Sequence, residues 1–172
     1  WQEMKNKLVS GDVTLRTGVR EMLESIESEK YPAVLDFVAK IPLRPGFEQL
    51  LDFLDVRAIP FIVVSGGVRG MVEAGLGRLT RRARQIFAVD VDDSGPYLKV
   101  HSEFEGGDEL VAKVEVLNRF DADFRIVIGD GMTDHNMARN GDLGFARSSL
   151  ARYLEKHNID HIRSKDFHDV RK

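Results

Sequence analysis

Two aspartates near the end of an apolar segment are the residues of this chain best suited to chemistry. Residues 124–128 are apolar except for Arg125 and end at Gly129-Asp130, and Asp134 follows in a polar stretch typical of a helix. A buried strand with this pattern would carry both carboxylates to the edge of a parallel sheet, where ligands bind. Carboxylate oxygens suit a hard cation such as Mg²⁺. An ordinary helix start, with Asp130 as its cap and Asp134 in solvent, explains the pattern equally well.

A serine and two glycines follow another apolar segment. Ser65, Gly66 and Gly67 come directly after residues 61–64, and a helix is expected over residues 68–79. A hydroxyl and unhindered backbone N–H groups in front of a helix suit an anion. The lysine and the spacing of nucleotide-binding loops are missing, so we expect a single phosphate. The alternative is an ordinary strand-to-helix turn that Ser65 caps.

Lys113 stands among apolar residues in a helix expected over residues 109–120. A lysine in this setting is most often a surface residue whose charged end reaches water. Beside a phosphate, it would instead neutralise the charge on the phosphoryl oxygens.

The elements that must position these residues change in character near residue 44. Residues 1–43 have the periodicity of helices alone, with Leu15, Val19 and Leu23 on one apolar face. From residue 44 onward, apolar strands alternate with amphipathic helices, which is typical of a parallel sheet with crossover helices. The expected strands cover residues 60–64, 86–91, 97–104, 124–128, 143–146 and 159–162.

The composition of the 172 residues excludes several classes of partner. The formal net charge is −3 and the charges are mixed, so neither nucleic-acid nor membrane binding is expected. No apolar run has the length of a membrane span, and no secretion signal opens the sequence. The absence of cysteine favours the cytoplasm. We expect a monomer or a homodimer.

The order of these features resembles a known superfamily. Ser65, Lys113 and the run Gly129-Asp130-Gly131-Met132-Thr133-Asp134 are similar to the second, third and fourth motifs of the haloacid dehalogenase superfamily, in its phosphoserine-phosphatase-like branch. Within that branch, the opening helices and the tail of the chain look most like the phosphatases of methionine salvage. The resemblance implies a three-layer, Rossmann-like α/β fold. Residues 1–43 would form a helical cap, and residues 44–172 the phosphatase core without its first strand.

The resemblance also implies roles for individual residues. Asp130 would bind Mg²⁺ directly, and Asp134 would hold a metal-bound water or orient its neighbours. The phosphate would be bound by Ser65, Gly66, Gly67, Lys113 and Thr133, of which Ser65 and Lys113 would take part in catalysis. Arg16, Arg20 and Lys30 are candidates for reaching the leaving group, although a solvated helix face is the more usual explanation for such residues.

One motif of the superfamily is missing from residues 1–172. Its members open with an apolar strand that ends in Asp-x-Asp, whose first aspartate is the nucleophile. Asp90-Val91-Asp92 is the nearest match, but it follows Ser65 in the chain and leads into a hairpin. Because Trp1 is no translation start, we expect an upstream segment whose strand lies between those that end at Ser65 and Asp130.

We therefore expect a Mg²⁺-dependent phosphomonoesterase that acts on a small phosphorylated metabolite through an aspartyl-phosphate intermediate. One alternative is a non-catalytic protein of the same fold that binds a phosphorylated ligand. Another is a phosphoserine phosphatase in place of a methionine-salvage enzyme. A receiver-like signalling domain also groups acidic residues at strand ends, but Ser65-Gly66-Gly67 and the opening helices argue against it.

Overall fold

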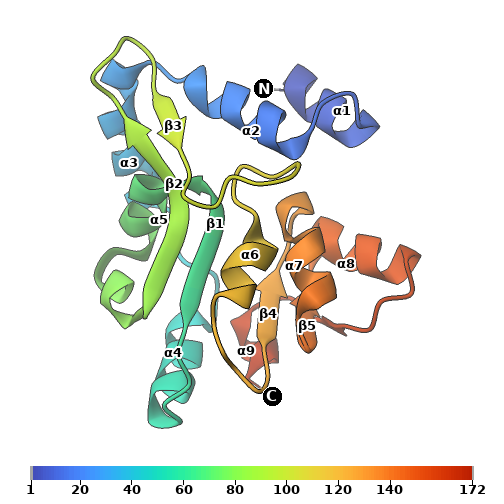
Figure 1. Ribbon diagram of the computed structural model, residues 1–172. Coiled ribbons are helices and arrows are strands. Elements are labelled where there is room, and N and C mark those ends of the chain that lie inside the picture. The colour runs from blue at the N-terminus through green and yellow to red at the C-terminus, as the bar shows by residue number, and fades with distance from the viewer. Residues whose placement is uncertain (1, 172) are drawn as a thin grey trace. The chain divides into compact units, whose positions relative to one another are not determined.

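The computed structural model describes residues 2–171, so Trp1 and Lys172 lie outside the described part. Helices and strands divide into two units (Figure 1). The first unit contains the chain up to Leu43 and residues 61–112, and the second contains residues 44–60 and 113–172. The predicted α/β class with parallel strands is confirmed. No helix within residues 2–171 combines the length and the apolar character needed to cross a lipid bilayer.

A three-stranded sheet in the order β1-β2-β3 forms the centre of the first unit. β1 (Ile62–Val68) runs parallel to β2 (Gln85–Asp92), and β2 runs antiparallel to β3 (Lys99–His101). The return strand predicted over residues 97–104 is shorter, because the chain leaves the sheet after His101 and turns. β1 and β3 are the two edge strands of this sheet.

Helices cover this sheet, and those of residues 31–39 and 69–76 lie side by side on one face of β1 and β2 (Figure 1). Thr14 begins the helix of residues 15–24, because its hydroxyl accepts the backbone N–H of Thr17 at 3.2 Å. Gly18 allows the first two helices to approach, since a Cβ there would lie 2.6 Å from Cδ2 of Leu8. The helices of this unit are α1 (Gln2–Ser10), α2 (Leu15–Glu24), α3 (Tyr31–Ala39) and α5 (Arg69–Leu76), with 3-10 turns at Ser28–Lys30 and Gly77–Arg82.

The second unit contains a parallel sheet in the order β4-β5-β6. Its strands are β4 (Ile126–Gly129), β5 (Leu143–Ala146) and β6 (Ile162–Arg163). β4 is an edge strand. The core beside this sheet consists of buried apolar residues from two strands and two helices, namely Val127, Met137, Ala138, Ala146, Leu150, Ala151 and Leu154.

The helices of the second unit include two that are far apart in the chain but pack together. Phe47 and Phe167 lie with their ring centroids 4.9 Å apart. Gly46 precedes Phe47 with φ of +82°, and a Cβ there would lie 2.5 Å from the backbone nitrogen of His168. The helices are α4 (Phe47–Val56), α6 (Lys113–Asn118), α7 (His135–Asn140), α8 (Ser148–Lys156) and α9 (Phe167–Val170), with a 3-10 turn at Met132–Asp134.

Candidate active site

The carboxylate of Asp134 holds together the turn that follows β4. Its Oδ2 atom accepts the backbone N–H groups of Asp130 and Gly131, each at 2.9 Å. Its Oδ1 atom accepts a hydrogen bond from Nζ of Lys113 at 2.6 Å. Asp134 therefore fixes both the backbone of the turn and the position of the lysine.

The pair of Lys113 and Asp134 is buried, with side chains 5% and 10% exposed. Burial by itself would raise the pKa of Asp134, but the charge and hydrogen bond of Lys113, with the two backbone N–H groups, hold that pKa below its ordinary value. Asp134 is therefore a charged carboxylate at neutral pH. Removing one partner of such a pair typically costs about 3–5 kcal/mol, because the other charge stays buried and unpaired.

Thr133 lies beside this pair and extends it. Its Oγ1 atom accepts a second hydrogen bond from Nζ of Lys113, at 3.2 Å. The ammonium group is thus oriented by a carboxylate and a hydroxyl, and both come from the turn after β4. The structure brings Lys113, Thr133 and Asp134 together as the sequence motif predicts.

The two glycines of the motif differ in their surroundings. A Cβ at Gly129 would lie 2.8 Å from Cβ and Cγ of Asp134, closer than real side chains approach. At Gly131 the nearest atom would be 3.7 Å away, which is ordinary contact. Gly129 is therefore required because Asp134 folds back over it.

Asp130 has a fixed backbone and an exposed side chain. Its carbonyl oxygen accepts the N–H of Leu150 at 3.2 Å and the hydroxyl of Ser149 at 3.0 Å, so the start of α8 holds it. Its carboxylate is 52% exposed, and Oδ2 lies 3.4 Å from Nη2 of Arg44. No local sequence pattern indicates this arginine, because it lies 86 positions before Asp130 in the chain.

The donor set fits Mg²⁺ in part. Mg²⁺ in proteins is usually held by one or two carboxylates, with waters and phosphate oxygens completing its coordination. Asp130 is suited to bind the metal directly, because its carboxylate is exposed. Asp134 suits an orienting role, since its oxygens already accept three hydrogen bonds. Among residues 2–171, no three His, Cys, Asp or Glu side chains are grouped so that they would hold a metal alone.

Ser65, Gly66 and Gly67 form an irregularity at the end of β1, in the first unit. Val64 pairs with Phe87 and Val68 with Val89, so β1 advances four residues while β2 advances two. The hydroxyl of Ser65 accepts the N–H of Gly67 at 3.0 Å. Such bulges free a short segment from sheet pairing and are common beside binding sites. The predicted site residues are divided between the two units, since the second unit contains Asp130, Asp134, Lys113 and Thr133.

Comparison with known proteins decides the family. No protein-family model matches the chain. It is 43% identical over 161 residues to "2-hydroxy-3-keto-5-methylthiopentenyl-1-phosphate phosphatase" of Microcystis aeruginosa (strain NIES-843 / IAM M-2473), covering 92% of this chain and 77% of that protein. The chain belongs to this phosphatase family. A family member from Bacillus cereus (strain ATCC 10987 / NRS 248) is 29% identical, and 98% of this chain and 80% of that protein are covered.

Solved structures support the fold of this phosphatase family. A phosphoserine phosphatase from T. onnurineus superposes with a TM-score of 0.71 over 99% of this chain, at 18% identity. A substrate-bound phosphoserine phosphatase complex gives a TM-score of 0.67, also at 18% identity. Likeness at this identity concerns the fold, and it confirms the predicted Rossmann-like class. The assignment to this phosphatase family confirms the prediction of an enzyme and the resemblance to haloacid dehalogenase phosphatases, and the fold agrees with that resemblance.

Asp90, the nearest internal match to the nucleophile of these phosphatases, is bound to an arginine in the structure. Both of its carboxylate oxygens accept hydrogen bonds from the guanidinium of Arg69, with Nε at 2.5 Å and Nη2 at 3.4 Å. A third nitrogen of Arg69 donates to the carbonyl of Ile86 at 2.7 Å. Asp90 thus anchors the start of α5 on β2, and this pairing adds to the chain-order argument against Asp90 as the nucleophile.

All three residues of the predicted cap that were suggested for the leaving group are also paired with a glutamate. Lys30 lies 2.7 Å from a carboxylate oxygen of Glu27. Arg20 lies 2.7 Å from Glu105 and also binds the carbonyl of Val100 on β3 and the carboxylate of Glu24 on α2. Arg16 is less tightly held, since its Nε is 4.0 Å from Glu105.

Proposed function

We propose that this family member is a Mg²⁺-dependent phosphomonoesterase that hydrolyses 2-hydroxy-3-keto-5-methylthiopentenyl 1-phosphate in methionine salvage in the cytoplasm. The name of its 43% identical relative supports the substrate. The observation that carries the activity is the buried Lys113, which the turn after β4 orients through Thr133 and Asp134. Asp134 binds both this ammonium and the backbone of Asp130, whose carboxylate is exposed, and such a pair of groups suits a site for a phosphate and a metal ion.

Each residue of the site would have a distinct role in the reaction. Lys113 neutralises charge on the phosphoryl oxygens, and Ser65 with the backbone N–H of Gly66 donates hydrogen bonds to them. The N–H of Gly67, which the sequence also suggested for this role, instead donates to the hydroxyl of Ser65 and holds it in place. Asp130 would hold Mg²⁺, which supplies further positive charge when it is bound. Asp134 keeps Asp130 and Lys113 in place. Residues 1–43 would cover the substrate as a cap.

The nucleophile of the proposed reaction lies outside residues 1–172. An aspartate carboxylate would attack phosphorus, and the bond from phosphorus to the substrate oxygen would break as that oxygen takes a proton. Water would then cleave the aspartyl-phosphate and release inorganic phosphate. Support for an additional strand that carries this residue comes from β1 and β4. Each is the edge strand of its own sheet, and edge strands present N–H and C=O groups for pairing.

Phosphoserine is the second candidate substrate, because the solved neighbours are phosphoserine phosphatases. The carboxylate and ammonium of phosphoserine need charged partners. The thiopentenyl substrate carries, by its name, hydroxy, keto and methylthio groups beside its phosphate, and these groups are uncharged. Arg20 is poorly suited to a substrate carboxylate, because it already neutralises Glu105 at 2.7 Å. This pairing favours the uncharged leaving group.

The test is hydrolysis of both substrates by the full natural chain, first with Mg²⁺ and then with EDTA. We expect kcat/KM for the thiopentenyl phosphate to exceed that for phosphoserine by at least about 100-fold, since an unmatched charged group is strongly rejected. EDTA should abolish both activities. Preference for phosphoserine would refute the substrate assignment. Phosphate binding without any hydrolysis would favour the non-catalytic alternative.

A further inference from the structure

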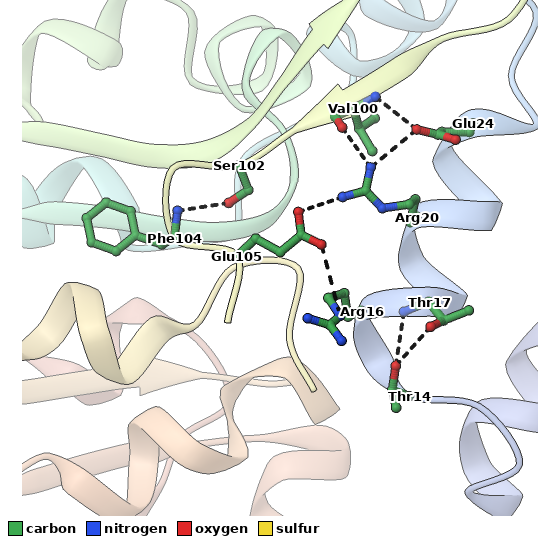
Figure 2. A network of polar contacts seen from close by, with 9 residues as sticks. All are labelled: Thr14, Arg16, Thr17, Arg20, Glu24, Val100, Ser102, Phe104 and Glu105. Carbon is green, nitrogen blue, oxygen red and sulfur yellow. Dashed lines mark hydrogen bonds and ion pairs between the residues drawn. The ribbon is translucent and has the colours of Figure 1, made fainter. Parts of the chain in front are cut away.

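An arginine and a glutamate on α2 together bind one residue of the edge strand β3 (Figure 2). Nη1 of Arg20 donates to the carbonyl of Val100 at 2.8 Å, and Oε1 of Glu24 accepts the N–H of Val100 at 3.2 Å. The two side chains also contact each other at 3.4 Å. They thus satisfy both outward main-chain groups of Val100, as a neighbouring strand would.

The same arginine reaches the loop that follows β3. Nη2 of Arg20 donates to Oε2 of Glu105 at 2.7 Å, and the side chains are 30% and 33% exposed. One turn earlier, the backbone N–H of Arg16 donates to the carbonyl of Asp108 at 2.6 Å. Figure 2 shows the Arg20 side chain extending from the helix between Val100 and Glu105. Arg20 therefore connects α2, β3 and this loop.

The end of α2 is attached in a different way. The N–H of Leu98 donates to the carbonyl of Ile26 at 3.0 Å, and the N–H of Ser28 donates to the carbonyl of Pro96 at 3.0 Å. These are main-chain bonds that a side-chain substitution leaves in place. The attachment of α2 to the loop can therefore be weakened without detaching the helix.

The loop in question is compact and leads to the lysine of the candidate site. Gly106 and Glu109 exchange backbone hydrogen bonds at 3.2 and 3.0 Å, and the N–H of Ala112 donates to the carbonyl of Phe104 at 2.7 Å. The ring of Phe104 packs edge-on against Phe87, with centroids 5.2 Å apart. Lys113 is the next residue after Ala112. A shift of Glu105 would therefore be passed along a short, closed segment to Lys113.

We propose that Arg20 is a positioning residue for the phosphatase reaction, which acts by holding Glu105 and so fixing the segment that delivers Lys113. This role rests on the proposed function, because it requires that Lys113 binds the transferred phosphate. It differs from direct contact with the leaving group, since the guanidinium is already bound to Glu105 and Val100.

The first test compares Arg20→Met with Arg163→Met in the full natural chain. Arg163 is a matched control, because it also pairs with a glutamate, Glu155, at 3.0 Å but lies outside the proposed machinery. We expect Arg20→Met to lower kcat/KM and to raise the inhibition constant of inorganic phosphate, each by about tenfold, while Arg163→Met changes each by less than about twofold. Equal effects of the two substitutions would overturn the proposal.

The second test asks whether Arg20 acts through Lys113. In a Lys113→Met background, Arg20→Met should lower kcat/KM by less than about twofold, because the group that it positions is gone. A full tenfold loss in that background would mean that Arg20 acts independently of Lys113. Since Lys113→Met leaves Asp134 unpaired, the cycle is repeated with Lys113→Arg, which keeps the charge. There the effect of Arg20→Met should again be reduced.

Hydrogen exchange separates failure of this proposal from failure of the proposed function. Arg20→Met should speed exchange of the Ala112 amide, which the loop protects, and Arg163→Met should not. Unchanged exchange at Ala112 would overturn the link between Arg20 and the loop, whatever the activity. A wild-type protein that hydrolyses no phosphate ester would refute the proposed function, and the catalytic role of Arg20 with it. An active wild type with an unaffected Arg20→Met variant would refute only the role of Arg20.

Discussion

Asp130 and Asp134 are four positions apart in one motif, yet their side chains have different environments. The carboxylate of Asp134 is buried and accepts three hydrogen bonds, whereas that of Asp130 is about half exposed. Burial and donor count therefore separate a residue that shapes the turn from one that is available to a cation. The sequence motif places both residues at the site but cannot tell the two environments apart.

The close packing of Asp134 on Gly129 leads to a prediction about stability. Gly129→Ala should lower the free energy of unfolding by about 1–3 kcal/mol, because its Cβ would push Asp134 away from Lys113 and from the backbone donors. Gly131→Ala is the matched control and should cost much less, since its Cβ meets nothing closer than 3.7 Å. Urea unfolding measures both. Similar losses at the two positions would show that the contact with Asp134 is unimportant.

At the scale of elements, α2 is held to the first unit by polar contacts as well as by packing. Glu24 carries part of this attachment, because it binds Val100, Lys99 and Arg20. Burial alone would raise the pKa of Glu24, but the Val100 N–H and the charges of Lys99 and Arg20 hold that pKa below its ordinary value of 4.5. The folded state therefore favours the ionised carboxylate.

This lowered pKa predicts a loss of stability in acid. A carboxylate whose pKa is lower in the folded state stabilises the protein above its unfolded pKa, and the contribution disappears as the pH falls through the folded pKa. Between about pH 5 and pH 3, the unfolding free energy of the wild type should therefore fall more steeply than that of Glu24→Gln. Urea unfolding at several pH values measures the difference. Glu29→Gln, at an exposed position, should follow the wild type; parallel curves for Glu24→Gln and wild type would contradict the prediction.

The elements were predicted best where local pattern and burial agree. The strand expected over residues 143–146 is found as Leu143–Ala146. The helix expected over residues 109–120 begins only at Lys113. Leu110, Val111 and Ala112 are buried, but they lie in a loop that the N–H of Ala112 closes by donating to the carbonyl of Phe104. An apolar run predicts that its residues are buried. It does not predict their backbone conformation, because that depends on hydrogen bonds to residues outside the run.

At the scale of the whole molecule, the two units do not follow chain order. Residues 44–60 belong with residues 113–172. Phe47 packs on Phe167, and the N–H of Phe167 donates to the carbonyl of Pro45 at 3.1 Å. Local periodicity does not indicate contacts between residues so far apart in the chain. For the same reason, the sequence revealed the motif from Gly129 to Asp134 but neither the contact of Arg44 with Asp130 nor that of Arg20 with Glu105. The predicted division into a cap of residues 1–43 and a core of residues 44–172 stays a prediction.

The exposed carboxylate of Asp130 predicts that metal binding stabilises the whole protein. A ligand that binds only the folded state adds RT ln(1 + [L]/Kd), or about 2.7 kcal/mol at one hundred times its Kd. Mg²⁺ should therefore raise the Tm of the full natural chain, and EDTA should reverse the rise. Asp130→Asn removes one ligand charge from a site that has few, so it should abolish the shift and the Mg²⁺-dependent turnover without unfolding the protein. Asp160→Asn, at an exposed position of the same unit, should keep the shift. An Asp130→Asn variant with the Mg²⁺ response of the wild type would remove this residue from the metal site.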